Sequence, residues 1–259
     1  MKVAEVDWQT NVRVSAVHSL RAVHDGRTLH NGNLHASLTS LLQQHAAGPD
    51  AAPHDWNALV ARSLQGKTSD EIVLQAERAL LQVYPDLAEQ LRLRVRPIQE
   101  QWETCGTGLI RAITKTLGAP QRTKATPSVV LVQPVVGGAA TAYPEQELVV
   151  MEAVLANSHR ELPETLRLAW GLSQLIAHSV ADRNESRLDE IATIPACLQV
   201  GEHFDLCRFD QATIDLAWQV WPSSAQLAVP PQVAMDWWQS IDSDGSWADR
   251  LGALASQVL

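Results

Sequence analysis

The sequence predicts an α+β fold, a mostly helical single domain with a small two- or three-stranded sheet around a buried central helix at about residues 162–182. Three observations lead to this prediction. Apolar residues recur at helical spacing along most of the chain. Two β-branched runs, residues 128–136 and 147–155, are typical of short buried strands. Between residues 162 and 182, apolar side chains cover nearly every direction of a helix, as in helices that are buried on all sides.

The chain has 259 residues, which is long for one compact core and short for two full domains. We therefore expect one main α+β domain with an appendage. Residues 1–52 are predicted to form a helical N-terminal arm and linker, ending in the Pro- and Ala-rich stretch 48–53. Residues 53–259 are predicted to form the main domain.

Before the strands, helical spacing predicts six helices, at about residues 11–24, 33–47, 56–64, 70–84, 85–97 and 98–117. The alternation over residues 12–16 also suits a strand, so the first helix has an alternative. Asn33 is expected to cap the second helix. Pro97 is expected to end or kink the fifth, because proline lacks a backbone N–H. Gly106 and Gly108 lie inside the sixth helix, where close packing of a neighbour would explain them.

The strands are separated by a flexible Gly-rich loop, residues 137–144, and Pro134 is expected at a sheet edge or a bulge. After the central helix, a turn at residues 183–187 leads into the C-terminal part. Asp210 is a predicted helix cap, and Pro195 is expected to bend the helix that contains it. Four more helices are predicted, at about residues 187–200, 210–221, 231–241 and 246–259.

Charge and composition exclude several functional classes. The formal net charge is -9 and no basic tract is present, which argues against binding to nucleic acid or to an anionic membrane. No apolar run is long enough to predict a membrane-spanning helix, and no signal-peptide pattern is visible. The three cysteines are too few and too scattered to predict a disulfide framework. We therefore expect a cytoplasmic protein.

The strong catalytic and cofactor motifs are missing from the sequence. It contains no Gly-rich nucleotide-binding loop, no G-x-S-x-G nucleophile turn, no H-E-x-x-H zinc motif and no paired C-x-x-C. No cofactor and no metal are therefore predicted.

The central helix carries the polar residues that are most suggestive of a site. Arg167, Gln174 and His178 lie on one stripe of an otherwise apolar helix, and Glu185 and Asp189 follow it. Polar groups in such a position either line a cavity or are satisfied within the core. As a weak catalytic hypothesis, His178 would carry a proton, because its ordinary pKa suits that role. The alternative interpretation is that the stripe is the partly wet edge of the helix.

The order of elements over about residues 98–190 resembles that of gluzincin metalloproteases. In that family, the helix after the buried one carries an E-x-x-x-D motif, which Glu185 and Asp189 match. The H-E-x-x-H motif of the buried helix is absent here, and without it the hydrolysis cannot run. At most, the resemblance implies a catalytically inactive relative.

The chain is rich in tryptophan, with nine Trp against two Tyr and two Phe. Trp is enriched at binding surfaces, and it also fills cores. Trp237 and Trp238 are adjacent, so they cannot point in the same direction on a helix. The candidate partner-binding residues are therefore Trp218, Trp221, Trp237 and Trp238, and a tryptophan-rich core is the alternative.

Two clusters of potential ligands do not have a recognisable metal-site spacing. Six of the nine histidines precede residue 55, but His18, His24 and His30 recur every six residues and do not build one helix face. They are interpreted as solvent-exposed polar residues. Cys197, His203 and Cys207 also match no recurring zinc site, and are interpreted as two buried thiols and a hydrogen-bonded histidine.

These observations leave two hypotheses for the function. The first is a non-catalytic cytoplasmic protein that acts by binding a protein partner or by self-association as a homo-oligomer. The second is an enzyme or a small-molecule-binding protein with an unfamiliar site on the helix at residues 162–182.

Overall fold

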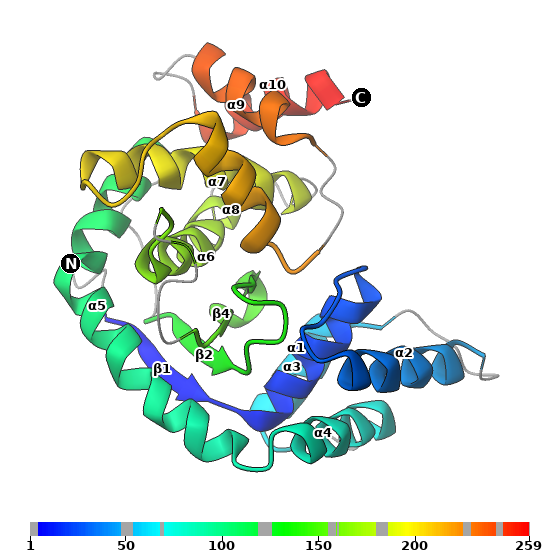
Figure 1. Cartoon of the computed structure of the whole chain (residues 1–259). Helices are drawn as coiled ribbons and strands as arrows, with labels where there is room; N and C mark the ends of the chain where they lie inside the picture. The colour runs from blue at the N-terminus through cyan, green and yellow to red at the C-terminus, as the bar shows by residue number, and fades with distance from the viewer. Residues whose placement is uncertain are drawn as a thin grey trace.

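The computed structural model confirms the predicted fold class, with helices packed around a small mixed sheet (Figure 1). It describes residues 5–47, 54–67, 70–118, 126–154, 159, 161–179, 186–224, 229–241 and 246–258. The described elements are, in chain order, β1 (Asp7–Thr10), α1 (Val12–His24), α2 (Gly32–Ala46), α3 (Trp56–Leu64), α4 (Glu71–Val83), α5 (Leu87–Thr116), β2 (Ser128–Val132), β3 (Ala140–Tyr143), the short 3-10 helix η1 (Pro144–Gln146), β4 (Leu148–Glu152), α6 (Glu164–His178), α7 (Ser186–His203), α8 (Gln211–Val220), α9 (Pro231–Ser240) and α10 (Trp247–Val258).

The described sheet has four strands in the order β1-β2-β4-β3, rather than the two or three that the sequence predicts. β1, β2 and β4 run parallel, and β3 is antiparallel to β4. β2 and β4 are paired from Ser128 with Leu148 to Val132 with Glu152. Almost every residue of these two strands is buried, which explains why both segments are continuous apolar runs.

The N-terminal segment that we expected to be a helical arm contributes to both the sheet and the core. Residues 7–10, for which no strand was predicted, form the edge strand β1 beside β2. Residues 12–16 are helical, so the strand alternative for this stretch is wrong. Val14, Val17 and Leu20 of α1 are fully buried, and α1 packs against β2 as well as against α2, α3 and α4.

The central helix α6 lies between the sheet and the helices α5 and α7, as its apolar composition predicts (Figure 1). It begins at Glu164 and ends at His178, within the predicted range of 162–182. Residues 180–182 lie outside the described residues. Gly171 allows the close approach of this helix to the sheet, because a Cβ atom at this position would lie 2.7 Å from Cγ1 of Val149.

The helix α5 is continuous through Pro97, so the prediction that a helix ends at this residue is wrong, while a kink there stays a prediction. Leu91 and Ile98 are buried on either side of the proline and hold both halves against the core. The glycines inside α5 have the predicted packing role. The ring of Trp102 covers Gly106, and Phe204 approaches Gly108.

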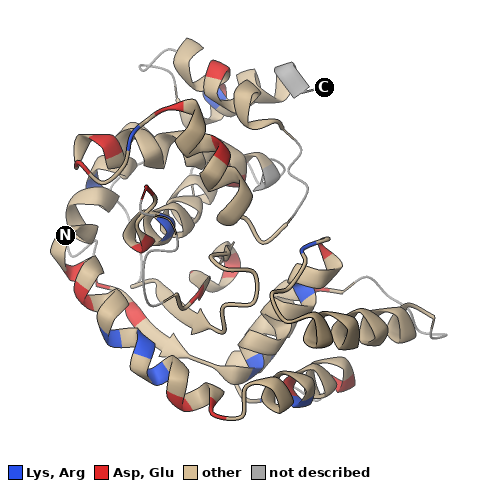
Figure 2. Cartoon of the chain, in the orientation of Figure 1, with Lys and Arg blue, Asp and Glu red and all other residues tan. Residues whose placement is uncertain are grey.

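The C-terminal helices form a layer at the other end of the molecule from α1–α4 (Figure 1). α7 contacts α6, α8, α9 and α10, and Pro195 lies inside it. Asp210 caps α8 as predicted, since its carboxylate accepts a hydrogen bond from the backbone N–H of Thr213 at 2.9 Å. Figure 2 shows both acidic and basic residues along α5.

Candidate functional site

The polar stripe of α6 is largely buried. Arg167 and Gln174 are 2% and 8% exposed, and His178 is half-buried near the end of the helix. The guanidinium of Arg167 donates through Nη2 to the carboxylate of Glu164, and to the backbone oxygen of Glu152 at 2.8 Å. Burial lowers the pKa of Arg167 to about 10, against the opposite effect of the Glu152 charge. Arg167 therefore ties the start of α6 to the end of β4.

Glu152 is the most extensively hydrogen-bonded carboxylate of the core. It is fully buried, and it accepts hydrogen bonds from the five successive backbone N–H groups of residues 135–139, at 2.6–3.2 Å. His18 of α1 contacts the same carboxylate through Nε2 at 3.2 Å. Because an ionised carboxylate only accepts hydrogen bonds, His18 must carry its proton on Nε2.

The hydrogen bonds decide the ionisation of Glu152. Burial alone would raise its pKa, but the hydrogen bond and charge of His18, together with the backbone N–H groups, lower it to about 2. Gly137 and Gly138, with φ of 100° and 143°, allow the loop to turn its N–H groups inward. The carboxylate thus organises the loop between β2 and β3, and it is already occupied by the protein's own groups.

The space beside Arg167 is too small for a substrate. Among the described residues, Nε and Nη1 of Arg167 have no hydrogen-bond partner. They border a cavity of about 10 Å³ that is lined by Gly138, Glu164 and Trp221, among others. A cavity of this size holds about one water molecule at most.

The remaining candidates of the catalytic hypothesis do not complete a site around this stripe. Glu185 lies outside the described residues. Asp189 is buried on α7, and its Oδ1 accepts a hydrogen bond from Nε1 of Trp247 at 3.1 Å. Nε2 of Gln174 is buried without a hydrogen-bond partner among the described residues. The described part of the stripe therefore serves packing and internal pairing.

Three of the four candidate partner-binding tryptophans lie in the core. Trp221, Trp237 and Trp238 are 1%, 0% and 8% exposed. Trp221 stacks on Trp170 of α6, with ring centroids 5.6 Å apart. Trp237 and Trp238 donate hydrogen bonds to the chain itself, to Arg250 and Gln199 respectively. Only the fourth, Trp218, is partly exposed, on α8.

The Cys197, His203 and Cys207 cluster does not converge on one point. Cys197 is buried and donates to Oγ of Ser173, while Cys207 is half-buried beside the backbone oxygen of Leu198. Burial raises the pKa of both thiols to about 12, so they stay protonated at neutral pH. His203 is exposed. Within the described ranges, no group of three or more His, Cys, Asp or Glu side chains is arranged to hold a metal ion.

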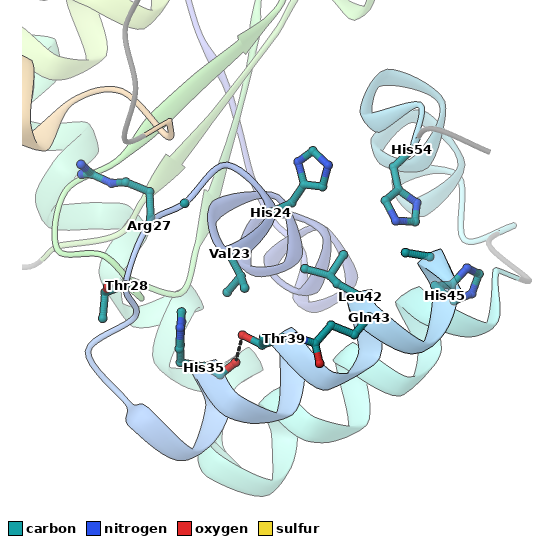
Figure 3. Close-up of a pocket in the computed structure, with 12 residues that line it drawn as sticks. Val23, His24, Arg27, Thr28, His35, Thr39, Leu42, Gln43, His45 and His54 are labelled. Atoms are coloured by element: carbon teal, nitrogen blue, oxygen red, sulfur yellow. Dashed lines mark hydrogen bonds between the residues drawn. The ribbon is translucent and has the colours of Figure 1, made fainter. Parts of the chain in front are cut away.

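A much larger pocket lies away from α6, in a groove between the end of α1, α2 and His54, which lies two residues before α3 (Figure 3). Its volume is about 700 Å³. We call it the α1–α2 groove, and define it by its lining residues Val23, His24, Gly26, Arg27, Thr28, His35, Thr39, Leu42, Gln43, His45, Ala46 and His54.

Three histidines gather at one end of the α1–α2 groove, while His35 and Thr28 lie toward the other end (Figure 3). The ring centroid of His54 lies 6.1 Å from that of His24 and 5.9 Å from that of His45. Burial, and then the positive charges that His24 and His45 can carry, lower the pKa of His54. The groove therefore combines the hydrogen-bonding rings of the histidines with an apolar surface from Val23 and Leu42.

The sequence interpretation missed this groove. His18 is 1% exposed and paired with Glu152, so its interpretation as a solvent-exposed residue is wrong. Four other histidines line one groove, from the end of α1, from α2 and from the segment just before α3, and three of them gather at one end of it. Their spacing along one helix could not show this, because the loops between the elements bring them together. The density of histidines before residue 55 is the signal that the sequence does contain.

Comparison of the chain with protein-family models, with curated proteins and with solved structures found no match. The gluzincin resemblance, which rests on the order of elements, thus stays a prediction. Over the described residues, no helix combines the length and the apolar character that crossing a membrane requires.

Proposed function

We propose that the protein acts by binding a small molecule in the α1–α2 groove, and that it has no catalytic activity of its own. The observation that carries this proposal is the pocket itself. Its volume of about 700 Å³ falls in the range of roughly 300–1,000 Å³ that is typical of small-molecule sites. Its lining joins an apolar surface, from Val23 and Leu42, to side chains that donate and accept hydrogen bonds.

The lack of a catalytic arrangement supports a binding role. Among the described residues of the groove lining there is no carboxylate, cysteine or serine, and the hydroxyl of Thr39 donates to the backbone oxygen of His35. Of the polar residues of α6 that were the candidates for chemistry, Arg167 is engaged in internal contacts. Arg167 binds Glu164, and the nearby Glu152 is held by His18 and backbone N–H groups.

Binding to a protein partner, or self-association, is less well supported as the main role. In the described part of the chain, Leu93 and Phe204 are the large apolar side chains that are clearly exposed, at 65% and 39%. Scattered exposed residues of this kind do not make an interface core. We also propose the cytoplasm as the location, because the three cysteines are free thiols, which suits a reducing compartment.

A fragment screen tests the binding role. Ligand-observed NMR would identify bound fragments from a library of mixed charge, and the hits would be repeated with Ala46→Trp. Ala46 is exposed and lines the groove, so a Trp side chain there is expected to fill it without disturbing the core. Ala36→Trp is the matched control, because Ala36 is also exposed on α2 but is not part of the lining.

We expect a set of fragments that bind the native protein and Ala36→Trp but not Ala46→Trp. No hit, or hits that Ala46→Trp binds equally well, would contradict the proposed function.

A further inference from the structure

The α1–α2 groove departs from the acidic character of the chain. The whole protein carries a formal net charge of -9, but none of the described residues that line the groove is acidic. Its titratable lining residues are Arg27 and four of the nine histidines of the chain, namely His24, His35, His45 and His54. Every charge that these side chains can gain is positive, so the groove becomes more positive as the pH falls.

Among the described residues, carboxylates near the groove follow the end of α1, precede α3 and end β4, and each has a partner in the protein. Asp25 binds Nδ1 of His24 at 2.7 Å and Arg21 at 3.4 Å, at the rim of the groove. Asp55 caps α3 by accepting from the N–H of Ala58.

The other charged groups that face these elements are also paired. Glu152 interacts electrostatically with Arg27, but its oxygens are already held by His18 and the loop N–H groups. On the helices packed beside α1, Glu77 of α4 binds Arg13 at the opposite end of α1. Arg62 of α3 binds Asp70.

We propose that the groove takes a small organic anion, a carboxylate, sulfonate or phosphate group on an apolar body, and takes it more tightly as its histidines become protonated. This inference rests on the proposed function, since it names the ligand class of the same site. Val23 and Leu42 would contact the apolar body, and the histidine end of the groove would receive the charged group.

The mutual repulsion of the histidines gives the physical reason for the pH dependence. The ring of His54 lies about 6 Å from the rings of His24 and His45, and its pKa is lowered by burial and then by the positive charges that these two rings can carry. A bound anion reverses the sign of this interaction, so its binding is coupled to proton uptake. His24 makes an edge-on contact with the ring of Trp56 and His54 makes a tilted one, at centroid distances of 5.3 and 5.1 Å, and these contacts help to hold the two rings in place.

The test compares two probes of almost the same shape. Benzenesulfonate is an anion and benzenesulfonamide is neutral over the working range. Their dissociation constants would be measured by NMR titration at about pH 5.5 and about pH 7.5, on either side of the ordinary histidine pKa. We expect benzenesulfonate to bind at least about tenfold more tightly at the lower pH. The Ala46→Trp variant is expected not to bind it. Benzenesulfonamide is expected to show no such change.

Histidine variants locate the effect. His24→Gln combined with His45→Gln is expected to remove most of the pH dependence, and both side chains are exposed, so the fold should tolerate the change. His203→Gln, an exposed histidine outside the groove, is the matched control and should leave the pH dependence unchanged.

Equal binding of the two probes, pH-independent binding of the sulfonate, or an unchanged pH dependence in the double variant would each overturn the anion inference. The binding role would survive those results, because the fragment screen judges it separately. If neither probe binds in the groove, the ligand class is wrong, and the proposed function fails only if the mixed-charge screen is also empty.

Discussion

At the scale of single residues, the carboxylate of Glu152 has the largest structural role. It joins β4 to the loop of residues 135–139 and to His18 of α1. Glu152→Gln would place an amide N–H₂ group opposite backbone N–H donors, leaving buried donors without an acceptor. We expect a loss of roughly 3–5 kcal/mol in the free energy of unfolding, as when one partner of a buried ion pair is removed. Urea denaturation followed by circular dichroism measures it.

Glu145→Gln is the control for this prediction, because Glu145 is an exposed residue just before β4. A loss no larger in Glu152→Gln than in Glu145→Gln would show that the buried hydrogen bonds do not stabilise the fold.

The same carboxylate predicts how stability depends on pH. The pKa of Glu152 falls from an ordinary value of 4.5 to about 2 in the folded state. Its stabilising contribution is therefore complete above about pH 4.5, and is lost as the pH falls toward 2, because the unfolded chain then binds the proton more readily. A shift of this size corresponds to roughly 3 kcal/mol. Glu152→Gln should show a flatter loss of stability over this range, and curves that stay parallel would contradict the assignment.

The sequence contained a signal that Glu152 is buried, but the prediction of a site on the central helix did not include this residue. Glu152 is flanked by apolar residues on both sides in the run of residues 147–155, which implies a buried carboxylate, and such a group needs partners. Arg167 was identified from its position on the central helix. His18 was not, because its partner is 134 residues away along the chain and no local spacing reports that contact.

At the scale of elements, the packing of α6 on the sheet depends on Gly171. A Cβ atom there would lie 2.7 Å from Cγ1 of Val149 on β4, so Gly171→Ala forces the helix and the strand apart. We expect a destabilisation of about 1–3 kcal/mol from overpacking, in spite of the better helix propensity of alanine. Thermal and urea denaturation would measure it.

Gly252→Ala is the control, and we expect it to change the free energy of unfolding in the opposite direction. Gly252 lies inside α10, and its Cβ would meet nothing within 4 Å. This substitution should be neutral or should stabilise by up to about 1 kcal/mol. If Gly171→Ala were as well tolerated as Gly252→Ala, the close approach of α6 to β4 would not be a requirement of the fold.

Elements were predictable where local signals decide them, and less so where distant pairing does. The apolar composition of α6 and the β-branched runs of β2 and β4 placed these three elements correctly. β1 was missed because Thr10 is its one β-branched residue, and because residues 7–10 become a strand only by pairing with residues 128–131. The cap of α2 was assigned to Asn33, but the side chain of Asn31 accepts the bond from the N–H of Leu34. Both residues have the right chemistry, so sequence alone could not choose between them.

At the scale of the whole molecule, α10 holds two other helices by buried polar contacts. Trp247 donates a hydrogen bond to Asp189 of α7, and Arg250 donates to the backbone oxygen of Thr116 at the end of α5, at 2.8 Å. Trp237 of α9 donates in turn to the backbone oxygen of Arg250. From the sequence, the tryptophan-rich segment could have formed either a binding surface or part of the core. These contacts, two of which join residues far apart in the sequence, place most of the tryptophan-rich segment in the core.

The link between α10 and α7 can be tested with Trp247→Phe. Trp247 is 2% exposed, and phenylalanine keeps most of its apolar contact while removing the indole N–H that Asp189 accepts. A hydrogen bond to a buried charged group is worth about 1.5–3 kcal/mol, so we expect a stability loss in that range in urea denaturation. Amide hydrogen exchange should show the loss of protection in both α7 and α10, because the bond joins them.

Trp218→Phe is the control, because Trp218 is partly exposed, and it is expected to change stability by less than about 0.5 kcal/mol. Faster exchange confined to α10 would mean that this helix packs on α7 without the polar contact coupling the two.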